Sequence, residues 1–334
     1  MKKVLVLGAS GAMATYLIPE LLDRGYLVKG VSLDDMTSDH ANLVYVKGNA
    51  KDIGYLGELL AEGYDAVVDF MVYYTEDFEE RYRLFLDNTE HYLFFSSYRV
   101  YADSAPITED SPLLIDVPRS DDFDTYHEYS IYKAEEERIL QNSGYRHFTV
   151  VRPAITYSQC RFQLTTLEAS VLLPRMRQGK TVLLPEGAMA REATMSWAGD
   201  VAKMLATILL NPKAYGETYT VSTSEHHTWR EIAEMYRRIG GLEYEVVSNE
   251  DYLRIIGDTV LLKQQLLYDR CFDRIVDNSK ILTLCGMTQA DLMPLEVGLR
   301  MEYEALTEER LARIGYDEYV NVRMDEYLEE RRKG

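Results

Sequence analysis

One stretch near the N-terminus constrains the fold of this chain more than any other, and it reads VLVLGASGAMA from Val4 to Ala14. Its four consecutive apolar residues predict a strand that is buried on both faces. After the glycines, apolar residues recur at helical spacing, at Ala14, Leu17, Ile18, Leu21 and Leu22. A buried strand, a glycine turn and a helix in this order are typical of a site that holds the pyrophosphate of a dinucleotide at the positive end of the helix.

The two glycines have separate roles in such a site. Gly8 can take the tight turn, and Gly11 lets backbone amides approach a pyrophosphate near the start of the helix, which we expect at about Ala12. The spacing Gly-x-x-Gly-x-x-Ala differs from the usual Gly-x-Gly-x-x-Gly, although Ala14 is small enough for close packing of helix on strand. Two alternatives remain open: a short signal peptide, although the glycines interrupt its apolar run, and a turn that is only structural.

Composition excludes several classes of protein. The formal net charge of −19 would repel a phosphate backbone, so we expect no nucleic-acid partner. No apolar run is long enough to cross a bilayer, so we expect no membrane association. The three cysteines, Cys160, Cys271 and Cys285, are far apart and lack metal-ligand spacing, which favours a reducing cytoplasm and no metal site.

Four further segments read as strands, namely Leu27–Ser32, Val44–Val46, Asp65–Phe70 and His91–Phe95. A single helix, at about 75–86, separates the last two. The pattern predicts an α/β fold with a Rossmann-type, doubly wound parallel sheet that is covered by helices on both faces. Ligands of such sheets bind beyond the C-terminal strand ends. We therefore expect the glycine turn, Phe70–Tyr73 and Ser96–Tyr98 to surround one crevice.

The end of the second predicted strand is where a dinucleotide binder usually recognises the adenosine ribose. Ser32 occupies this place, Asp34 follows, and no arginine stands nearby in the sequence to hold a 2′-phosphate. The acidic side chain favours NAD as the cofactor, whereas the serine leaves NADP open. We expect Asn49 and Ala50 beside the adenine. The predicted cofactor contacts are Gly8, Ser10, Gly11, Ala12, Met13, Ser32, Asp34, Asn49, Ala50, Phe70, Met71, Val72, Tyr129 and Lys133.

A candidate acid–base group stands later in the chain. Tyr129 and Lys133 are four residues apart in a helical segment, so both side chains can point at the crevice. A neighbouring ammonium favours the phenolate form of a tyrosine, which can then exchange a proton with a substrate hydroxyl. Ser97, at the end of the fifth predicted strand, can hold the substrate oxygen. The pair alone is not specific in a chain with 26 tyrosines, but its position after Ser97 and the glycine turn is.

Five motifs in this order resemble those of the extended short-chain dehydrogenases/reductases, in their NAD-dependent epimerase/dehydratase branch. They are Gly8-x-x-Gly11-x-x-Ala14, Ser97-x-x-Val100-Tyr101, Tyr129-x-x-x-Lys133, Arg152-Pro153 and Gly199-Asp200-Val201-Ala202. The resemblance implies that Ser97, Tyr129 and Lys133 form the catalytic group. It also implies a Rossmann domain at 1–155 plus 196–224, and a smaller C-terminal α/β lobe for the substrate at 156–195 and 225–334.

Departures from the family pattern bear on the substrate. Dehydratases of this branch carry an Asp-Glu pair where this chain has Tyr98-Arg99, which disfavours sugar dehydration. Ile155 stands where nucleotide-sugar enzymes have an asparagine, and Arg191 lies near the place of a diphosphate-binding arginine. We take Tyr98, Arg99, Ile155 and Arg191 as the candidate substrate contacts.

Two segments differ in length from typical family members. The segment 70–96 is short by about one helix, so we expect any homodimer to use an altered interface. The acidic loop 103–124 is long, and it can be either a lid over the substrate or a solvated insertion.

Together these patterns predict a NAD(P)-dependent oxidoreductase or epimerase. It would act on a hydroxyl or carbonyl carbon of a small-molecule, sugar-like substrate, with hydride transfer and acid–base catalysis by Tyr129, Lys133 and Ser97. The alternative is a catalytically silent NAD(P)-binding regulator or scaffold, which Met71-Val72 and Ile155 motivate because they depart from the family pattern.

Overall fold

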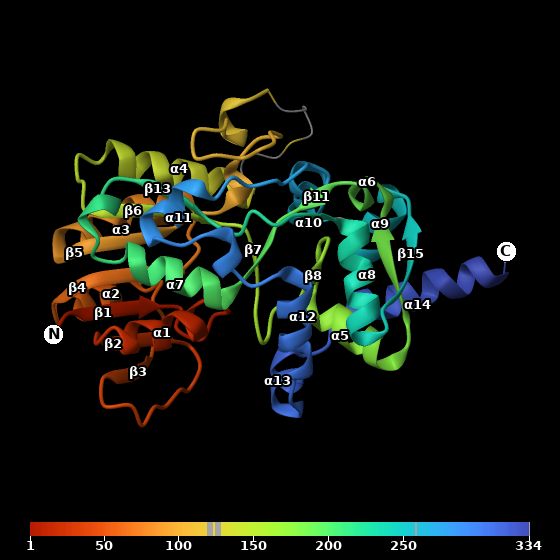
Figure 1. Cartoon of the computed structure of the whole chain (residues 1–334), viewed down its shortest axis with the longest axis horizontal. Coiled ribbons are helices and arrows are strands. Elements are labelled where there is room, and N and C mark those ends of the chain that lie inside the picture. The colour runs from red at the N-terminus through yellow and green to blue at the C-terminus, as the bar shows by residue number, and fades with distance from the viewer. Residues whose placement is uncertain (119–122, 124–127, 258, 334) are drawn as a thin grey trace.

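A seven-stranded parallel sheet forms one side of the molecule (Figure 1), in a computed structural model that describes residues 1–118, 123, 128–257 and 259–333. The strand order is β13-β6-β5-β4-β1-β2-β3, and each neighbouring pair is parallel. The strands are β1 Lys3–Leu7, β2 Leu27–Ser32, β3 Leu43–Lys47, β4 Tyr64–Asp69, β5 Thr89–Phe95, β6 Phe148–Pro153 and β13 Thr218–Val221. This architecture confirms the predicted doubly wound sheet.

Alternation along β1 shows how the sheet binds helices on both faces. Val4 and Val6 pack in one apolar cluster with α1 Ala14–Asp23, α7 Ala198–Ile208 and α11 Ser279–Cys285. Leu5 and Leu7 pack in another with α2 Ile53–Leu60, α3 Thr75–Asn88 and α4 Tyr129–Asn142. These four side chains of β1 are fully buried, as a strand covered on both faces requires.

The other side of the molecule is a smaller α/β lobe with its own apolar core. Its parallel strands β10 Thr181–Pro185 and β15 Glu243–Val247 pair with each other. The helices are α5 Ala169–Gln178, α6 Glu186–Met189, α8 Trp229–Gly240, α9 Asn249–Ile256, α10 Val260–Gln265, α12 Leu295–Glu304, α13 Glu308–Ile314 and α14 Glu318–Lys333.

Short strands connect the sheet to this lobe. They are β7 Ile155–Tyr157, β8 Gln163–Leu164, β9 Leu167–Glu168, β11 Glu192–Ala193, β12 Met195–Trp197 and β14 His227–Thr228. The chain crosses between the two sides several times, since β13 completes the sheet and α11 packs on α7 and β13. The helix α11 thus covers the sheet although it belongs to the segment 225–334. The domain boundaries stay a prediction.

Two local features differ from the sequence pattern. The strands β8 and β9 form a tight hairpin whose turn holds Thr165 at φ 53°, and α5 begins after it, at Ala169. The first helix begins at Ala14 rather than Ala12. Much of the predicted acidic loop is described, but its residues 119–122 and 124 lie outside the described residues.

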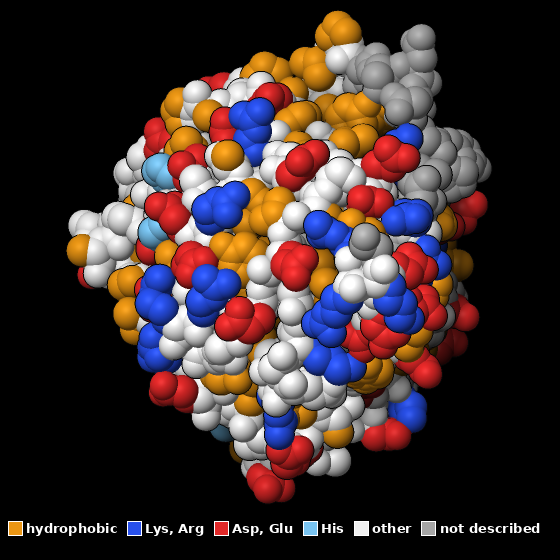
Figure 2. Space-filling view, turned by 90° about the vertical axis from the view of Figure 1, so that its right-hand side faces the viewer, with side chains coloured by type: hydrophobic (Ala, Val, Ile, Leu, Met, Phe, Trp, Pro, Cys, Tyr) orange, Lys and Arg blue, Asp and Glu red, His pale blue; other side chains and the backbone are white. Residues whose placement is uncertain are grey.

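Charges of both signs are mixed on the face that carries the C-terminal helix α14 (Figure 2), and the basic side chains there do not form a continuous stripe. Ion pairs such as Arg238–Glu296 account for part of this mixing. In the described ranges, no helix has the length and apolar character needed to cross a membrane.

Candidate active site

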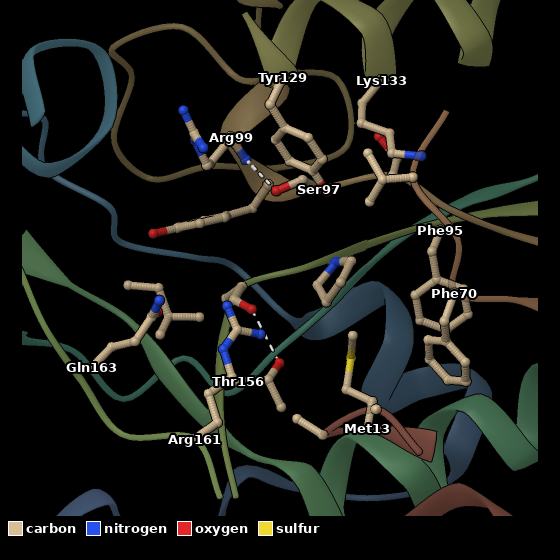
Figure 3. Close-up of a pocket in the computed structure, with 18 of the residues that line it drawn as sticks. Met13, Phe70, Phe95, Ser97, Arg99, Tyr129, Lys133, Thr156, Arg161 and Gln163 are labelled. Carbon is tan, nitrogen blue, oxygen red and sulfur yellow. Dashed lines mark hydrogen bonds between the residues drawn. The ribbon is translucent and has the colours of Figure 1, made fainter. Parts of the chain in front are cut away.

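A cavity of about 470 Å³ opens at the C-terminal ends of the central strands, between the sheet and the lobe (Figure 3). One wall is apolar and includes Met13, Phe70 and Phe95, with the rings of Phe70 and Phe95 at 4.2 Å between centroids. The opposite wall is polar. The lining also contains Gly11, Ala12, Ala14, Met71, Val72, Ser96, Ser97, Tyr98, Arg99, Tyr129, Lys133, Pro153, Ala154, Ile155, Thr156, Arg161, Gln163, Glu168, Leu261, Gln265 and Arg270.

The glycine turn has the geometry that a pyrophosphate requires. Gly8 has φ +83°, a value that only glycine adopts readily, and a Cβ on Gly11 would lie 3.2 Å from the carbonyl oxygen of Gly8. The side chain of Met13, the N-cap of α1, makes no capping hydrogen bond. Among the described residues, the amides of Ala12 and Ala14 donate no hydrogen bond. These free amides and the helix N-terminus fit a dinucleotide.

The predicted adenosine contacts gather beside this turn. The Ser10 and Ser32 hydroxyls lie 2.8 Å apart, and the amide of Asp34 donates to the Ser32 hydroxyl at 3.0 Å. Asn49 accepts a hydrogen bond from the amide of Lys51 at 3.0 Å, which leaves its side chain in a local turn, and Ala50 is buried.

An arginine does reach this place, although the sequence around Asp34 contains none. Arg313 of α13 donates to the carbonyl of Ser10 at 2.7 Å, and its guanidinium lies 3.8 Å from the carboxylate of Asp34. A second cavity, of about 220 Å³, lies between Ser10, Arg161 and Arg313. The sequence around Asp34 does not reveal this arginine, because α13 brings it from the far end of the chain.

The predicted catalytic side chains meet at the cavity. Ser97 follows β5, and its hydroxyl accepts a hydrogen bond from the amide of Arg99 at 3.2 Å. Tyr129 is the first residue of α4 and is half-buried, and Lys133 follows one turn later. Figure 3 shows both side chains descending from α4, with the Tyr129 ring directed toward Ser97.

Lys133 has a partner that the sequence analysis missed. Its ammonium is fully buried and lies 2.8 Å from a carboxylate oxygen of Glu136, 3.5 Å from the carbonyl of Met71 and 4.8 Å from the Phe94 ring centroid. Burial raises the pKa of Glu136 to about 7, against the opposing effect of Lys133. The other carboxylate oxygen of Glu136 is buried without a partner. The i,i+3 spacing from Lys133 is the sequence signal that could have found Glu136.

A second buried carboxylate, Asp69, lies at the end of β4. It accepts hydrogen bonds from the hydroxyls of Tyr92 at 2.8 Å and Tyr73 at 3.3 Å. Burial raises the pKa of Asp69, and the nearby charge of Lys133 opposes that rise. The Lys133 ammonium thus interacts with two buried carboxylates: it forms an ion pair with Glu136, and its charge acts on Asp69.

The polar wall is built from segments far apart in the sequence. Arg99 donates to Glu128, the N-cap of α4, at 2.7 Å. Arg270, in the short π-helical turn Leu266–Arg270, donates to the carbonyl of Thr165 at 2.7 Å. Arg161, Gln163 and Glu168 come from the loop and hairpin around β8 and β9.

The predicted substrate contacts divide. Tyr98, Arg99 and Ile155 line the cavity, whereas Arg191 does not. The guanidinium of Arg191 is half-exposed and lies 3.3 Å from the carboxylate of Asp273, outside the cavity. No sequence spacing pointed to Arg270 or Gln163, which take up the polar wall instead.

Comparisons with known proteins agree with this geometry. The sequence profile of the NAD dependent epimerase/dehydratase family matches residues 4–222. No curated protein sequence matches.

Solved structures share the fold at low sequence identity. The epimerase Mth375 from Methanothermobacter thermautotrophicus has a TM-score of 0.69 at 14% identity, with 91% of each chain covered. dTDP-glucose 4,6-dehydratase from Bacillus anthracis in complex with NAD has a TM-score of 0.67 at 18% identity, over 91% of this chain and 96% of that one. UDP-glucuronic acid 4-epimerase from Bacillus cereus, in complex with UDP-glucuronic acid and NAD, has 0.66 at 17%, over 90% and 98%.

Proposed function

Because this chain belongs to the NAD dependent epimerase/dehydratase family, we propose that it is a NAD(P)-dependent oxidoreductase or epimerase. It acts on a hydroxyl or carbonyl carbon of a small, sugar-like substrate. One observation carries the proposal: Ser97, Tyr129 and Lys133 line the same cavity as the glycine turn. The complex of one structural neighbour with UDP-glucuronic acid supports a sugar-like ligand.

The cofactor would be held by the glycine turn at its pyrophosphate and by Ser32 and Asp34 at its adenosine ribose. The free amides of α1 and the positive φ of Gly8 support this assignment. When bound, the nicotinamide supplies a reversible two-electron acceptor for the substrate carbon. We propose NAD as the cofactor, because complexes of two structural neighbours contain it and Asp34 disfavours an added phosphate.

Tyr129 is the proposed acid–base residue. Its hydroxyl exchanges a proton with the substrate hydroxyl, while the Ser97 hydroxyl donates a hydrogen bond to the same oxygen. The Lys133 ammonium, one helical turn away on α4, would orient the nicotinamide ribose in the same cavity. The apolar wall of Phe70, Phe95 and Met13 excludes water from the reacting carbon.

The test replaces one hydroxyl. In Tyr129→Phe we expect turnover to fall about 10²- to 10⁴-fold, because the proton donor is lost, while dinucleotide affinity stays within about two-fold. Turnover is measured over a panel of sugar nucleotides and simple alcohols, by the absorbance of reduced nicotinamide for net oxidation and by chromatography of the epimeric products for epimerisation, which regenerates the oxidised cofactor. Tyr132→Phe is the matched control, since Tyr132 lies on the same helix, packs on Tyr74 and does not line the cavity. Equal turnover by Tyr129→Phe and the wild type would remove the mechanism.

A second candidate function is dinucleotide binding without turnover. The ion pair of Lys133 with Glu136 favours it, because this carboxylate holds the ammonium that the reaction needs. Hydride transfer by the wild-type protein with any member of the panel excludes this candidate.

We further propose a cytoplasmic setting. The three cysteines form no disulfide in the structure, and no helix of the described ranges can span a membrane.

A further inference from the structure

The charges that line the cavity have the opposite sign to the protein. The chain carries a net charge of −19, yet the cavity lining contains four cationic side chains and one carboxylate. These are Arg99, Lys133, Arg161 and Arg270, and Glu168. Lys133 is paired with Glu136. Arg161 and Glu168 contribute one charge of each sign to the lining. The role of the two remaining cations, Arg99 and Arg270, is not explained by the proposed reaction.

Both arginines belong to one buried cluster. The side chains of Arg99 and Arg270 are 12% and 3% exposed, and both approach the carboxylate of Asp269. Arg274, also buried, binds the other oxygen of this carboxylate at 2.9 Å. Glu128 pairs with Arg99, and the charge of Glu168 also acts on Arg270. Within the described residues, the ion pairs of this cluster hold the guanidinium groups of Arg99 and Arg270 in fixed positions beside the cavity.

The cluster also has unused hydrogen-bond donors. Within the described ranges, the Nη1 of Arg99 and the Nη2 of Arg270 donate no hydrogen bond, whereas the buried Nε of Arg99 lies 3.9 Å from the Asp269 carboxylate. The two arginines come from different parts of the chain, one after β5 and one from the lobe, and both line the cavity. Guanidinium groups bind carboxylates with two parallel hydrogen bonds.

The position of Arg99 places the anion near the reaction. Its guanidinium carbon lies 5.4 Å from the centroid of the Tyr129 ring, and its own amide donates to the Ser97 hydroxyl. An anion on Arg99 therefore lies beside the proposed acid–base pair and not at a remote end of the substrate. A planar carboxylate can accept hydrogen bonds from two guanidinium groups that face the same cavity.

We propose that the substrate carries a carboxylate beside the carbon that reacts, and that Arg99 and Arg270 bind it. This inference rests on the proposed function and narrows it to acids of the uronic or hydroxy-acid class. In the complex, the carboxylate accepts hydrogen bonds from both guanidinium groups.

Binding and turnover of matched acids and neutral sugars test it. The probes are UDP-glucuronic acid against UDP-glucose, and glucuronate against glucose, each added to the full-length protein with NAD. Calorimetry measures affinity. Turnover is measured by nicotinamide absorbance for net oxidation and by chromatography of the epimeric products for epimerisation. We expect the acid of at least one pair to bind about ten-fold or more tightly than its neutral partner. Equal or weaker binding of the acid in both pairs, including no binding at all, overturns the inference.

Variants identify the residues. Arg270→Met should remove the preference for the acid and change the affinity for the neutral partner by less than about two-fold. Arg238→Met, an exposed arginine paired with Glu296, should keep the full preference. If Arg270→Met does not fold, as circular dichroism would show, Arg99→Lys keeps the charge and should reduce the preference by loss of the planar donors. A full preference in the folded variant contradicts the assignment.

The two proposals fail in different ways. Turnover of neutral sugars without a preference for acids leaves the proposed function intact and removes the inference. A preference for acids in binding, without hydride transfer by the wild type on either pair, keeps the carboxylate site and removes the proposed enzyme.

Discussion

The glycine-turn end of the cavity is made of backbone amides and apolar side chains, whereas the Arg270 end is made of buried charges. The first end comes from β1, α1 and β4, which are close in the sequence. The second is assembled from Arg99, the β8–β9 hairpin and the turn Leu266–Arg270. The contrast shows that the glycine-turn end depends on a short local sequence with few special residues. The Arg270 end depends on charged side chains that only the complete fold brings together.

One helix connects the two ends. The α4 N-cap, Glu128, binds Arg99, and Lys133 of the same helix faces the cofactor end. Farther along, Glu137 accepts two hydrogen bonds from Arg152 of β6, at 2.9 and 2.5 Å, and both side chains are buried. Disturbing this helix should therefore affect both ends, whereas changes elsewhere should separate them.

The largest effect is expected from Arg152→Met. The substitution leaves the Glu137 carboxylate buried without its partner, so we expect the free energy of unfolding to fall by about 3–5 kcal/mol. Urea denaturation followed by circular dichroism measures it. The exposed pair Arg238–Glu296 provides the control, where Arg238→Met should change the value by less than about 1 kcal/mol. A similar small change for Arg152→Met would show that α4 does not depend on this pair.

Glu136→Gln should change how stability depends on pH. The pKa of Glu136 is raised from an ordinary 4.5 to about 7 in the folded protein, so the folded state keeps a proton that the unfolded state has lost between these values. Its contribution to stability is therefore present below about pH 4.5 and lost as the pH rises through 7. Relative to the wild type, Glu136→Gln should gain on the order of 3 kcal/mol between about pH 5 and pH 8.

Thermal unfolding of both proteins across this pH range measures the gain. Glu135→Gln is the control on the same helix, because the Glu135 side chain is only partly buried, and it should show no such trend. A stability difference between Glu136→Gln and the wild type that does not change with pH would contradict the raised pKa of Glu136.

Gly8→Ala should damage the cofactor end alone. The backbone at φ +83° strains any residue with a Cβ by about 1–3 kcal/mol, and the new Cβ would lie 3.3 Å from the Cβ of Phe70. We expect weaker dinucleotide binding, measured by calorimetry, with no change in the preference for acids. Gly25→Ala has a similar φ of +80° and open space around it, so it should cost stability without affecting the dinucleotide. Equal dinucleotide affinities in the two variants would argue against the turn as the binding site.

The smallest effect is expected from Arg313→Ala. Arg313 and Asp34 are both more than half exposed, so the loss of their pair should cost less than about 1 kcal/mol of stability. Its removal leaves Asp34 unopposed beside the predicted ribose site, and we expect NADP to bind more weakly relative to NAD. Titration of both nucleotides measures the ratio, with Arg310→Ala on the same helix as the control. An unchanged ratio would exclude Arg313 from the choice of cofactor.

The sequence allowed the fold of the glycine-turn end to be predicted because its signals are local. The apolar run of β1 and the helical spacing after it lie within a few residues, and Tyr129 and Lys133 share a helix face. Strand ends were placed within about two residues, since hydrophobic alternation stops where burial stops.

The substrate end could not be predicted in the same way. Arg270 and Arg313 reach their sites only through tertiary packing, and their spacing from Ser97 or Ser10 carries no periodic signal. Arg191 was chosen because it lies near the place of a diphosphate-binding arginine in the family, but its side chain, just before β11, pairs with Asp273. The hairpin at Thr165 was missed because a threonine at positive φ leaves no mark in the sequence.

The late position of β13 has a consequence for synthesis. The strand pairs with β6 at the edge of the sheet, but 64 residues lie between Pro153 and Thr218. While a ribosome extends this interval, β6 presents an open row of amides and carbonyls to its surroundings. Two nascent chains on the same messenger could join at that row, so the protein is at its greatest risk of aggregating before the strand that protects it has been translated.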